Sequence, residues 1–328
     1  MNDRPNMKEM SSGLRPGDVV EVKSADEILE TLDSEGTLDQ LPFMPEMAEF
    51  CGRRFQISKR VMQTCYYTKA GSSGMRKFRR DDVFLLDGLR CSGEAHDGCQ
   101  KACMIFWREA WLRKVEVRAS VCKTQPRFQG PGTASIDSER HERLRARLKT
   151  STGPKTYFCQ ASELLKATNQ LSRWERVGKC FSEVHTGNCR TLEMVQHVMI
   201  WLYWRLRRVL LGEYARGTNK STPLENLSLL PGEWIEVKSM EGIRETMNET
   251  GHNRGLYFTP DMRVSCGKQQ RVERRIEKII VDGTGEMRDL RNTVYLEGSL
   301  CGCINSLGGC PRGEFSYWRE IWLRRLRR

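Results

Sequence analysis

Histidine and long apolar runs are both scarce in this sequence. Only 5 of its 328 residues are histidine, and the uncharged stretch Met194–Trp204 has 11 residues and is ended by an arginine at the next position. A membrane-spanning helix needs ~20 apolar residues, and the first residues lack the apolar core of a secretory signal. We therefore expect a cytoplasmic protein without a transmembrane segment, in which thiols stay reduced.

Recognised catalytic motifs are missing as well. The sequence has no glycine-rich phosphate loop, no G-x-S-x-G elbow, no H-E-x-x-H helix and no dinucleotide-binding fingerprint. These motifs supply phosphate binding, a nucleophilic serine, a catalytic zinc and pyrophosphate binding, respectively. Their absence counts against the corresponding enzyme classes and favours a protein that binds rather than catalyses.

The sequence does contain one pattern that occurs twice. Residues 16–51 align without a gap with residues 231–266, and both segments end in cysteine. Two further pairs of blocks match: VFLLDGLRC at 83–91 with TVYLEGSLC at 293–301, and FWREAWLR at 106–113 with YWREIWLR at 317–324. The pattern indicates two copies of one domain.

Each copy begins with a short alternating strand, continues through a long irregular loop and then returns to short strands. That order is typical of a small SH3-like barrel, and an α+β domain with its own topology is the alternative. We predict a β-rich α+β fold in which two related small SH3-like barrel domains, each with a cysteine-rich metal loop, flank a helical basic middle segment. The predicted parts are a flexible leader (1–14), repeat 1 (15–120), a linker and basic helical segment (121–228) and repeat 2 (229–328).

Cysteine is abundant, with 13 residues, and several cysteines occupy matching places in the two copies. Four thiolates, or three thiolates and an imidazole, form the tetrahedral set of a structural Zn²⁺ site. Cys103 and Cys65 are the alternatives to His96 as a ligand, an iron–sulfur cluster is the alternative to zinc, and core packing is the alternative role for a cysteine. We predict two zinc sites, with Cys51, Cys91, His96 and Cys99 in repeat 1 and Cys266, Cys301, Cys303 and Cys310 in repeat 2.

Aromatic residues recur with the cysteines. Two tryptophans four residues apart flank an Arg-Glu pair in each copy. Large aromatic side chains at this spacing are more often core residues than part of a binding surface. We therefore predict that Trp107, Trp111, Trp318 and Trp322 are buried.

The middle of the chain carries most of the excess positive charge. The net charge is +12, and residues 121–228 contain 18 Lys and Arg against 9 Asp and Glu. We expect an acidic partner (a protein, a nucleic acid or an anionic membrane surface) to bind through residues 139–220. The pattern of residues 191–214 predicts a long helix, which we interpret as buried in preference to lying at a lipid surface.

The blocks GDVVEVKS, LPFMPEM and YWREIWL, with the motif YFCQASELLKAT between the repeats, resemble a group of uncharacterised bacterial proteins. The resemblance covers most of both repeats. It implies a cytoplasmic bacterial protein that is accessory to a biosynthetic or surface-polysaccharide pathway. The second repeat of that group has a histidine three residues before its last loop cysteine; here that position is Leu307, and Cys303 is present instead.

Taken together, these features predict a non-catalytic, zinc-stabilised tandem-repeat binding protein. One alternative is an enzyme with a metal or iron–sulfur centre in repeat 1, which has more candidate ligands than one ion needs. A second is a nucleic-acid-binding protein, based on the charge and the segment WLYWRLRR (201–208), although no recognised reader motif is present. A nucleophilic pair or a further metal site is a lesser possibility for the cluster of Cys159, Cys180, His185 and Cys189.

Overall fold

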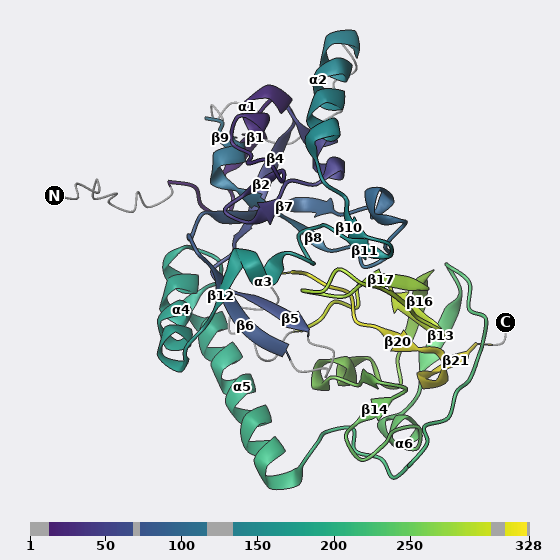
Figure 1. Cartoon of the computed structure of the whole chain (residues 1–328). Coiled ribbons are helices and arrows are strands. Elements are labelled where there is room, and N and C mark those ends of the chain that lie inside the picture. The colour runs from purple at the N-terminus through teal and green to yellow at the C-terminus, as the bar shows by residue number, and fades with distance from the viewer. Residues whose placement is uncertain (1–12, 68–72, 117–133, 303–311, 327–328) are drawn as a thin grey trace.

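The structure, a computed structural model, describes residues 13–67, 73–116, 134–302 and 312–326 (Figure 1). It is rich in antiparallel β-structure and has few helices, which confirms the β-rich class. A first five-stranded sheet has the order β8–β7–β4–β1–β9. Its strands are β1 (Val19–Val22), β4 (Arg54–Arg60), β7 (Val83–Arg90), β8 (Met104–Arg108) and β9 (Leu112–Lys114).

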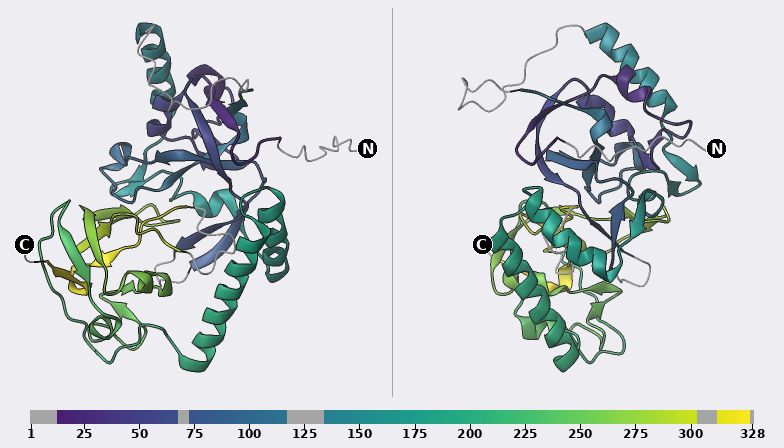
Figure 2. Two further views of the ribbon diagram at one scale, coloured as in Figure 1. Left: turned by 180° about the vertical axis from the view of Figure 1, so that it is seen from behind. Right: turned by 90° about the vertical axis from the view of Figure 1, so that its left-hand side faces the viewer.

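A second five-stranded sheet, formed by the C-terminal part of the chain, has the same strand arrangement. Its order is β20–β19–β16–β13–β21, and Figure 2 shows it on the opposite side of the molecule from the first sheet. The pairing of β4 with β7 shifts register between Ile57 and Lys59, and that of β16 with β19 shifts between Val272 and Arg274. The second set of strands is β13 (Trp234–Val237), β16 (Gln269–Arg275), β19 (Thr293–Leu296), β20 (Trp318–Arg319) and β21 (Leu323–Arg325).

The shorter helices and strands of the two parts also come in the same order along the chain, except that η2 (Glu94–His96) has no counterpart among the described residues of the last part. The first part has α1 (Ala25–Leu29), β2 (Thr37–Leu38), β3 (Leu41–Pro42), the 3₁₀ helix η1 (Pro45–Phe50), β5 (Thr64–Tyr67), β6 (Ser73–Phe78), η2 (Glu94–His96) and η3 (Glu109–Trp111). The last part has α6 (Met240–Arg244), β14 (His252–Asn253), β15 (Leu256–Tyr257), η4 (Pro260–Ser265), β17 (Lys278–Ile280), β18 (Met287–Asp289) and η5 (Glu320–Trp322).

The middle of the chain is partly helical and partly extended. It consists of α2 (Ala134–Arg147), β10 (Ser151–Gly153), β11 (Thr156–Tyr157), α3 (Leu164–Ala167), β12 (Thr168–Gln170), α4 (Arg173–His185) and α5 (Thr191–Leu211). Strand β12 pairs with β6, so this part of the chain is joined by backbone hydrogen bonds to the first part and is not a separate spacer.

The predicted tryptophan core is confirmed. Trp107, Trp111, Trp318 and Trp322 are all fully buried. In the first part, Phe43 packs edge-on against both tryptophans, with ring centroids 6.2 and 5.2 Å apart. Phe258 does the same in the last part, at 6.0 and 5.4 Å. The aromatic residues therefore form the same packing unit in both sheets.

In each core one buried indole N–H donates to a threonine hydroxyl; the indole N–H of Trp107 is also buried and has no hydrogen-bond partner in the described residues. Trp322 Nε1 donates to Thr246 Oγ1 at 3.2 Å, and Trp111 Nε1 donates to Thr31 Oγ1 at 3.0 Å. Each threonine hydroxyl in turn donates to a carbonyl oxygen three residues earlier, at 2.7 Å. The hydroxyl therefore satisfies a buried donor and ties the end of a short helix to the core.

Replacing Thr246 with valine should lower the free energy of unfolding by about 1–3 kcal/mol, because the buried indole N–H then has no acceptor. Thr31→Val should have a similar effect, measured by urea denaturation. The exposed residue Thr284 provides the control, since Thr284→Val should change stability by less than ~0.5 kcal/mol. Equal effects of all three substitutions would show that the buried hydrogen bonds do not matter.

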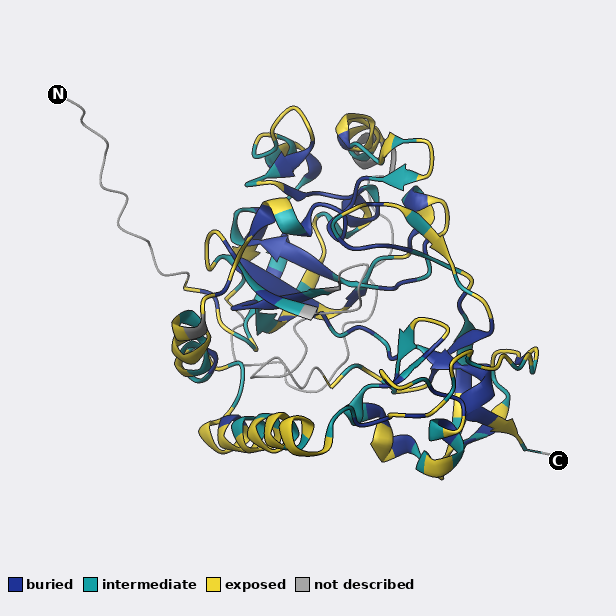
Figure 3. Cartoon of the chain, turned by 60° about the horizontal axis from the view of Figure 1, so that its bottom comes forward, coloured by how far each residue is buried: buried dark blue, intermediate teal, exposed yellow. Residues whose placement is uncertain are grey.

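The long helix predicted over residues 191–214 forms as α5, but the prediction that it is buried is wrong. Of its residues only Met194 is buried, and Figure 3 shows the helix exposed along most of its length. The helix contacts the rest of the chain where it meets α4 and where Trp204 packs on Tyr214 with ring centroids 5.1 Å apart. Its apolar composition is therefore not explained by the packing of this chain.

The two parts of the chain meet through their hairpins and cysteine loops. The backbone N–H of Ile280, in β17, donates to Cys99 Sγ at 3.3 Å. Cys301 packs against a small cluster of Cys65, Met75 and Leu171, which belongs to β5, β6 and the adjoining middle segment. The β5–β6 hairpin thus lies against the loop that follows β19, and the β17–β18 hairpin lies against the loop that follows β7.

Four charged side chains are buried together at this junction. Lys101 Nζ lies 2.5 Å from Asp282 Oδ1 and 3.3 Å from Glu314 Oε1. Arg312 lies 2.6 Å from Asp282 Oδ2 and 2.9 Å from Glu314 Oε1. Each of the four residues is at most 5% exposed. Two cations and two anions balance one another, so the junction carries no net charge from this group.

Candidate metal centre

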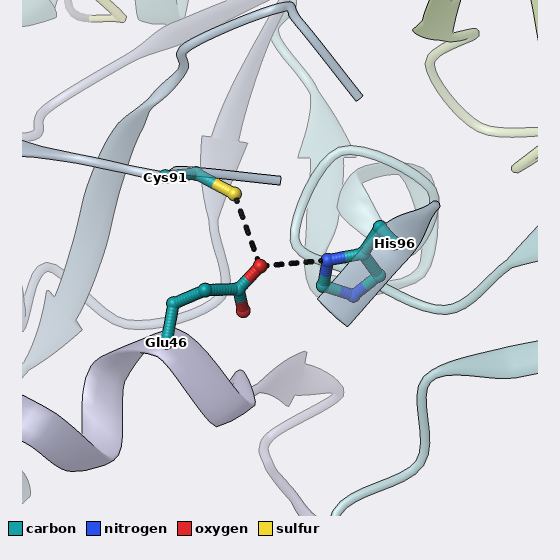
Figure 4. A group of neighbouring side chains, drawn as sticks. All are labelled: Glu46, Cys91 and His96. Carbon is teal, nitrogen blue, oxygen red and sulfur yellow. Dashed lines mark hydrogen bonds and ion pairs between the residues drawn. The ribbon is translucent and has the colours of Figure 1, made fainter. Parts of the chain in front are cut away.

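Three ligand-type side chains converge in the first part of the chain. Glu46 comes from η1, Cys91 directly follows β7, and His96 ends η2 (Figure 4). One ligand atom from each lies within 4.8 Å of the other two, and within the described ranges this is the one such group of three or more His, Cys, Asp or Glu residues. Glu46 and His96 are buried, and Cys91 is partly buried.

Local structure explains how the loop after β7 presents His96. Gly93 has a φ of +76°, and a Cβ at that position would lie 2.0 Å from the carbonyl oxygen of Cys99. Only glycine can occupy this position without displacing the loop. The carbonyl of Gly93 accepts hydrogen bonds from the backbone N–H of His96 at 3.0 Å and of Gly98 at 2.9 Å. The tight turn thereby directs the imidazole towards η1.

Both ring nitrogens of His96 have defined partners. Nε2 lies 3.0 Å from the carbonyl oxygen of Phe158, and Nδ1 lies 3.0 Å from Glu46 Oε1. A backbone carbonyl can only accept, so Nε2 carries a proton. Nδ1 is consequently the nitrogen that faces Glu46 and Cys91, and a carbonyl that fixes the other nitrogen is the usual support of a metal-bound histidine.

Burial and neighbouring charges shift the titration of this group. Burial by itself would raise the pKa of Glu46, but the hydrogen bond and charge of His96 outweigh it, so the pKa lies below its usual value. Burial, reinforced by the Glu46 carboxylate, raises the pKa of the Cys91 thiol well above its usual value. That thiol donates to Glu46 Oε1 at 3.7 Å. The other carboxylate oxygen, Oε2, is buried and has no hydrogen-bond partner.

Nitrogen, oxygen and sulfur are all donor atoms that zinc takes. With ~2.1 Å to nitrogen and oxygen and ~2.3 Å to sulfur, tetrahedral zinc holds such ligand atoms roughly 3.4–3.6 Å apart. Cys91 Sγ lies 3.7 Å from Glu46 Oε1, close to this spacing, whereas His96 Nδ1 lies 3.0 Å from the same oxygen, which is a direct hydrogen bond. His96 and Glu46 would therefore have to move slightly apart to hold an ion between them. A buried carboxylate oxygen without a partner is also what a site for a cation leaves.

The remaining cysteines of the predicted first site lie elsewhere. Cys51 ends η1 and is outside the group of three; burial raises the pKa of its thiol to about 12. Cys99 is buried and its sulfur accepts the N–H of Ile280. Cys103, the alternative ligand, accepts from Arg312 Nη2 at 3.8 Å and so faces the buried charges. The structure brings together Cys91 and His96 from the predicted set.

Sequence reasoning missed Glu46, and it placed Cys159 in a different cluster. Glu46 follows Pro45 in the repeated Pro-acid-Met triplet, whose second copy is Pro260-Asp261-Met262; this repetition was the available signal. Cys159 is buried in the same core as Cys99, and the preceding carbonyl, that of Phe158, is the partner of His96. Burial raises the pKa of the Cys159 thiol to about 12. Within the described residues, Cys159 does not form a ligand group with Cys180, His185 and Cys189.

The second predicted site is described in part. Cys266 ends η4 with φ −57° and ψ 132°, close to the values of −55° and 135° at Cys51. Asp261, the counterpart of Glu46, accepts a hydrogen bond from the backbone N–H of Gly302 at 2.8 Å. The acidic residue therefore lies over the cysteine loop here too. Cys303 and Cys310 fall outside the described residues.

No protein-family model matches this sequence, and comparisons with curated proteins and with solved structures give no significant match. In the described part of the chain, no helix combines the length and the apolar character that crossing a membrane requires.

Proposed function

We propose that this chain is a non-catalytic, metal-stabilised tandem-repeat binding protein that holds zinc. The observation that carries the proposal is the buried group of Glu46, Cys91 and His96, with two ligand-to-ligand separations of 3.0 and 3.7 Å. A structural zinc site holds its ion with four protein ligands and no open position. Such a site stabilises a small β-rich unit without contributing a reaction.

Cys159 is the fourth ligand in this proposal. Cys99 and Cys103 are the other thiols of this loop: Cys99 Sγ accepts from the backbone N–H of Ile280, and Cys103 Sγ accepts from the Arg312 side chain. Cys159 is buried, and Cys103 and Cys159 both contribute to the raised pKa of Cys91; of these two thiols, Cys103 also faces the Arg312 guanidinium. Cys159 directly follows Phe158, whose carbonyl oxygen lies 3.0 Å from His96 Nε2. A Cys₂-His-Glu set would then link the middle segment to the first sheet.

Zinc is favoured over an iron–sulfur cluster because the ligand atoms are of three kinds. Zinc accepts sulfur, nitrogen and oxygen ligands together, whereas iron–sulfur clusters are held chiefly by cysteine thiolates. The shared strand order of the two sheets supports the further proposal that they are two copies of an SH3-like domain. We propose that the second predicted set, Cys266, Cys301, Cys303 and Cys310, holds a second ion; of its members, Cys301 is the counterpart of Cys91.

Metal analysis of the purified full chain tests the proposal. We expect about two equivalents of zinc per chain and no absorbance between about 300 and 450 nm, because zinc is colourless and iron–sulfur clusters absorb there. One equivalent would support the first site alone. Folded protein that contains neither zinc nor iron, after purification without chelators and in reducing buffer, would rule out the metal-stabilised class.

We also propose that the partner is acidic and binds through residues 139–220, in a cytoplasmic accessory role in a bacterial biosynthetic pathway. Helix α2, within this region, extends away from the sheets (Figure 1) and presents Arg143, Arg145 and Arg147 to solvent. Exposed arginines on a projecting helix attract an anionic surface. Among acidic partners, a nucleic acid would be identified by a gel shift whose affinity falls steeply with salt.

A further inference from the structure

Helix α5 carries a line of exposed apolar side chains that nothing in the described chain covers. The residues are spaced alternately by three and four positions, which is the heptad seam by which one α-helix packs against another. Each is between 40% and 80% exposed. The seam consists of Leu192, Val195, Met199, Leu202, Leu206 and Val209.

We propose that this seam binds the same seam of a second copy, so that two α5 helices pair in antiparallel orientation. A two-fold interface requires a self-complementary surface, and the seam has this property about its midpoint between Met199 and Leu202. Met199 then lies opposite Leu202 of the other copy. The outer layers, in the same register, pair position 195 with 206 and position 192 with 209.

The charges along α5 favour the antiparallel orientation. Arg205, Arg207 and Arg208 all lie in its C-terminal half, and Glu193 is its one acidic residue. A parallel pair would place the two arginine groups side by side, and like charges at such a contact are unfavourable. An antiparallel pair places them at opposite ends of the helix pair.

The arginines are also engaged within the chain, which favours a second copy over a lipid surface. Arg205 lies over the ring of Trp201, 5.2 Å from its centroid, and Arg207 lies 4.9 Å from that of Tyr214. Arg208 is 3.5 Å from Glu213. A helix that lies at a lipid surface needs cations that are free to reach the lipid headgroups. Pairing of two helices through the seam depends on the apolar side chains and does not require free cations.

The size of the seam suits a modest dimer. Covering the six seam residues together with the exposed side chains of Tyr203 and Leu210 removes several hundred Å² from water on each copy, approaching the ~800 Å² per partner of a standard interface. Helix α5 has 21 residues, which is enough for the three consecutive heptad turns that contain the seam. We therefore expect a reversible dimer.

The test is the mass of the full chain in solution, measured by light scattering after size-exclusion chromatography across a concentration series. The wild type should be a dimer, and Leu202→Glu should shift it to monomer, with at least a tenfold weaker self-association. Ile200→Glu is the matched control, because Ile200 is 49% exposed on the same helix but lies off the seam. It should leave the dimer intact.

A rescue variant tests the register. Met199→Lys combined with Leu202→Glu in one chain places opposite charges across both central layers and should restore the dimer that Leu202→Glu loses. Flotation with vesicles of phosphatidylcholine and phosphatidylserine tests whether the seam binds a lipid surface instead of a second copy. A wild type that is monomeric throughout, whether or not it floats with these vesicles, would overturn the proposal. So would a dimer that Leu202→Glu and Ile200→Glu weaken equally, while circular dichroism shows both variants folded.

Discussion

Asp282→Ala should lower the free energy of unfolding by about 3–5 kcal/mol, the largest effect we expect from a single substitution outside the metal ligands. The reason is that Asp282 is the shared anion of the buried group at the junction. Its two carboxylate oxygens lie 2.5 Å from Lys101 Nζ and 2.6 Å from Arg312 Nη1. Without it, two buried cations remain with Glu314 as their single anion. Urea denaturation of the full chain measures the loss.

Asp289 supplies the matched control, since it lies on the same hairpin and is exposed. Asp289→Ala should change stability by less than ~0.5 kcal/mol. Burial alone would raise the pKa of Asp282, but the charges of Arg312 and Lys101 lower it below its usual value. A carboxylate whose pKa is lowered in the folded state stabilises the fold above its unfolded pKa. The difference between wild type and Asp282→Ala should therefore persist from neutral pH to about pH 4 and shrink only in stronger acid.

The ligand variants should have the second large effect. Cys91→Ala, His96→Ala and Cys159→Ala should each remove about one equivalent of zinc and lower the stability by several kcal/mol, because formation of a structural zinc site is coupled to folding. Glu46→Gln should weaken zinc binding, since it replaces a carboxylate oxygen by a neutral amide. Metal content per chain and thermal unfolding with and without a chelator are the measurements.

Other cysteines provide the controls for this series. Cys65→Ala should cost on the order of 1 kcal/mol as a truncation in the core and release no metal. Cys103→Ala should also retain zinc, because its sulfur faces Arg312. Cys51 and Cys99 separate the two ligand sets: zinc loss from their alanine variants, with retention in Cys159→Ala, would support the set predicted from sequence and contradict the one derived from the geometry.

Some features of this protein could be read from local sequence patterns. The tryptophans at matching positions predicted a core that the structure contains, because large aromatic side chains in water-soluble proteins are buried wherever the fold permits. The amphipathic pattern of residues 191–214 predicted a helix, and α5 forms there. These predictions depend on interactions between residues near one another in the chain, and periodicity records such interactions directly.

The surroundings of each element could not be read in this way. Nothing in the pattern of α5 distinguishes an apolar helix buried in its own chain from one that is exposed for a partner, and only the tertiary structure showed it to be exposed. The same limit applies to the thiols. Cys51 and Cys91 each have a matching cysteine in the second repeat, Cys266 and Cys301, yet of the two only Cys91 belongs to the group with His96.

The sequence by itself determined the repetition, the β-rich character and the identities of the buried aromatic residues. The tertiary structure decided which side chains converge: Glu46 with His96 across 50 residues of chain, and Lys101 with Asp282 across 181. The physical reason is that ligands and ion pairs are selected by distance in space. Folding brings such residues together through the packing of the sheets and hairpins, and this long-range packing leaves no periodic signal in the residues themselves.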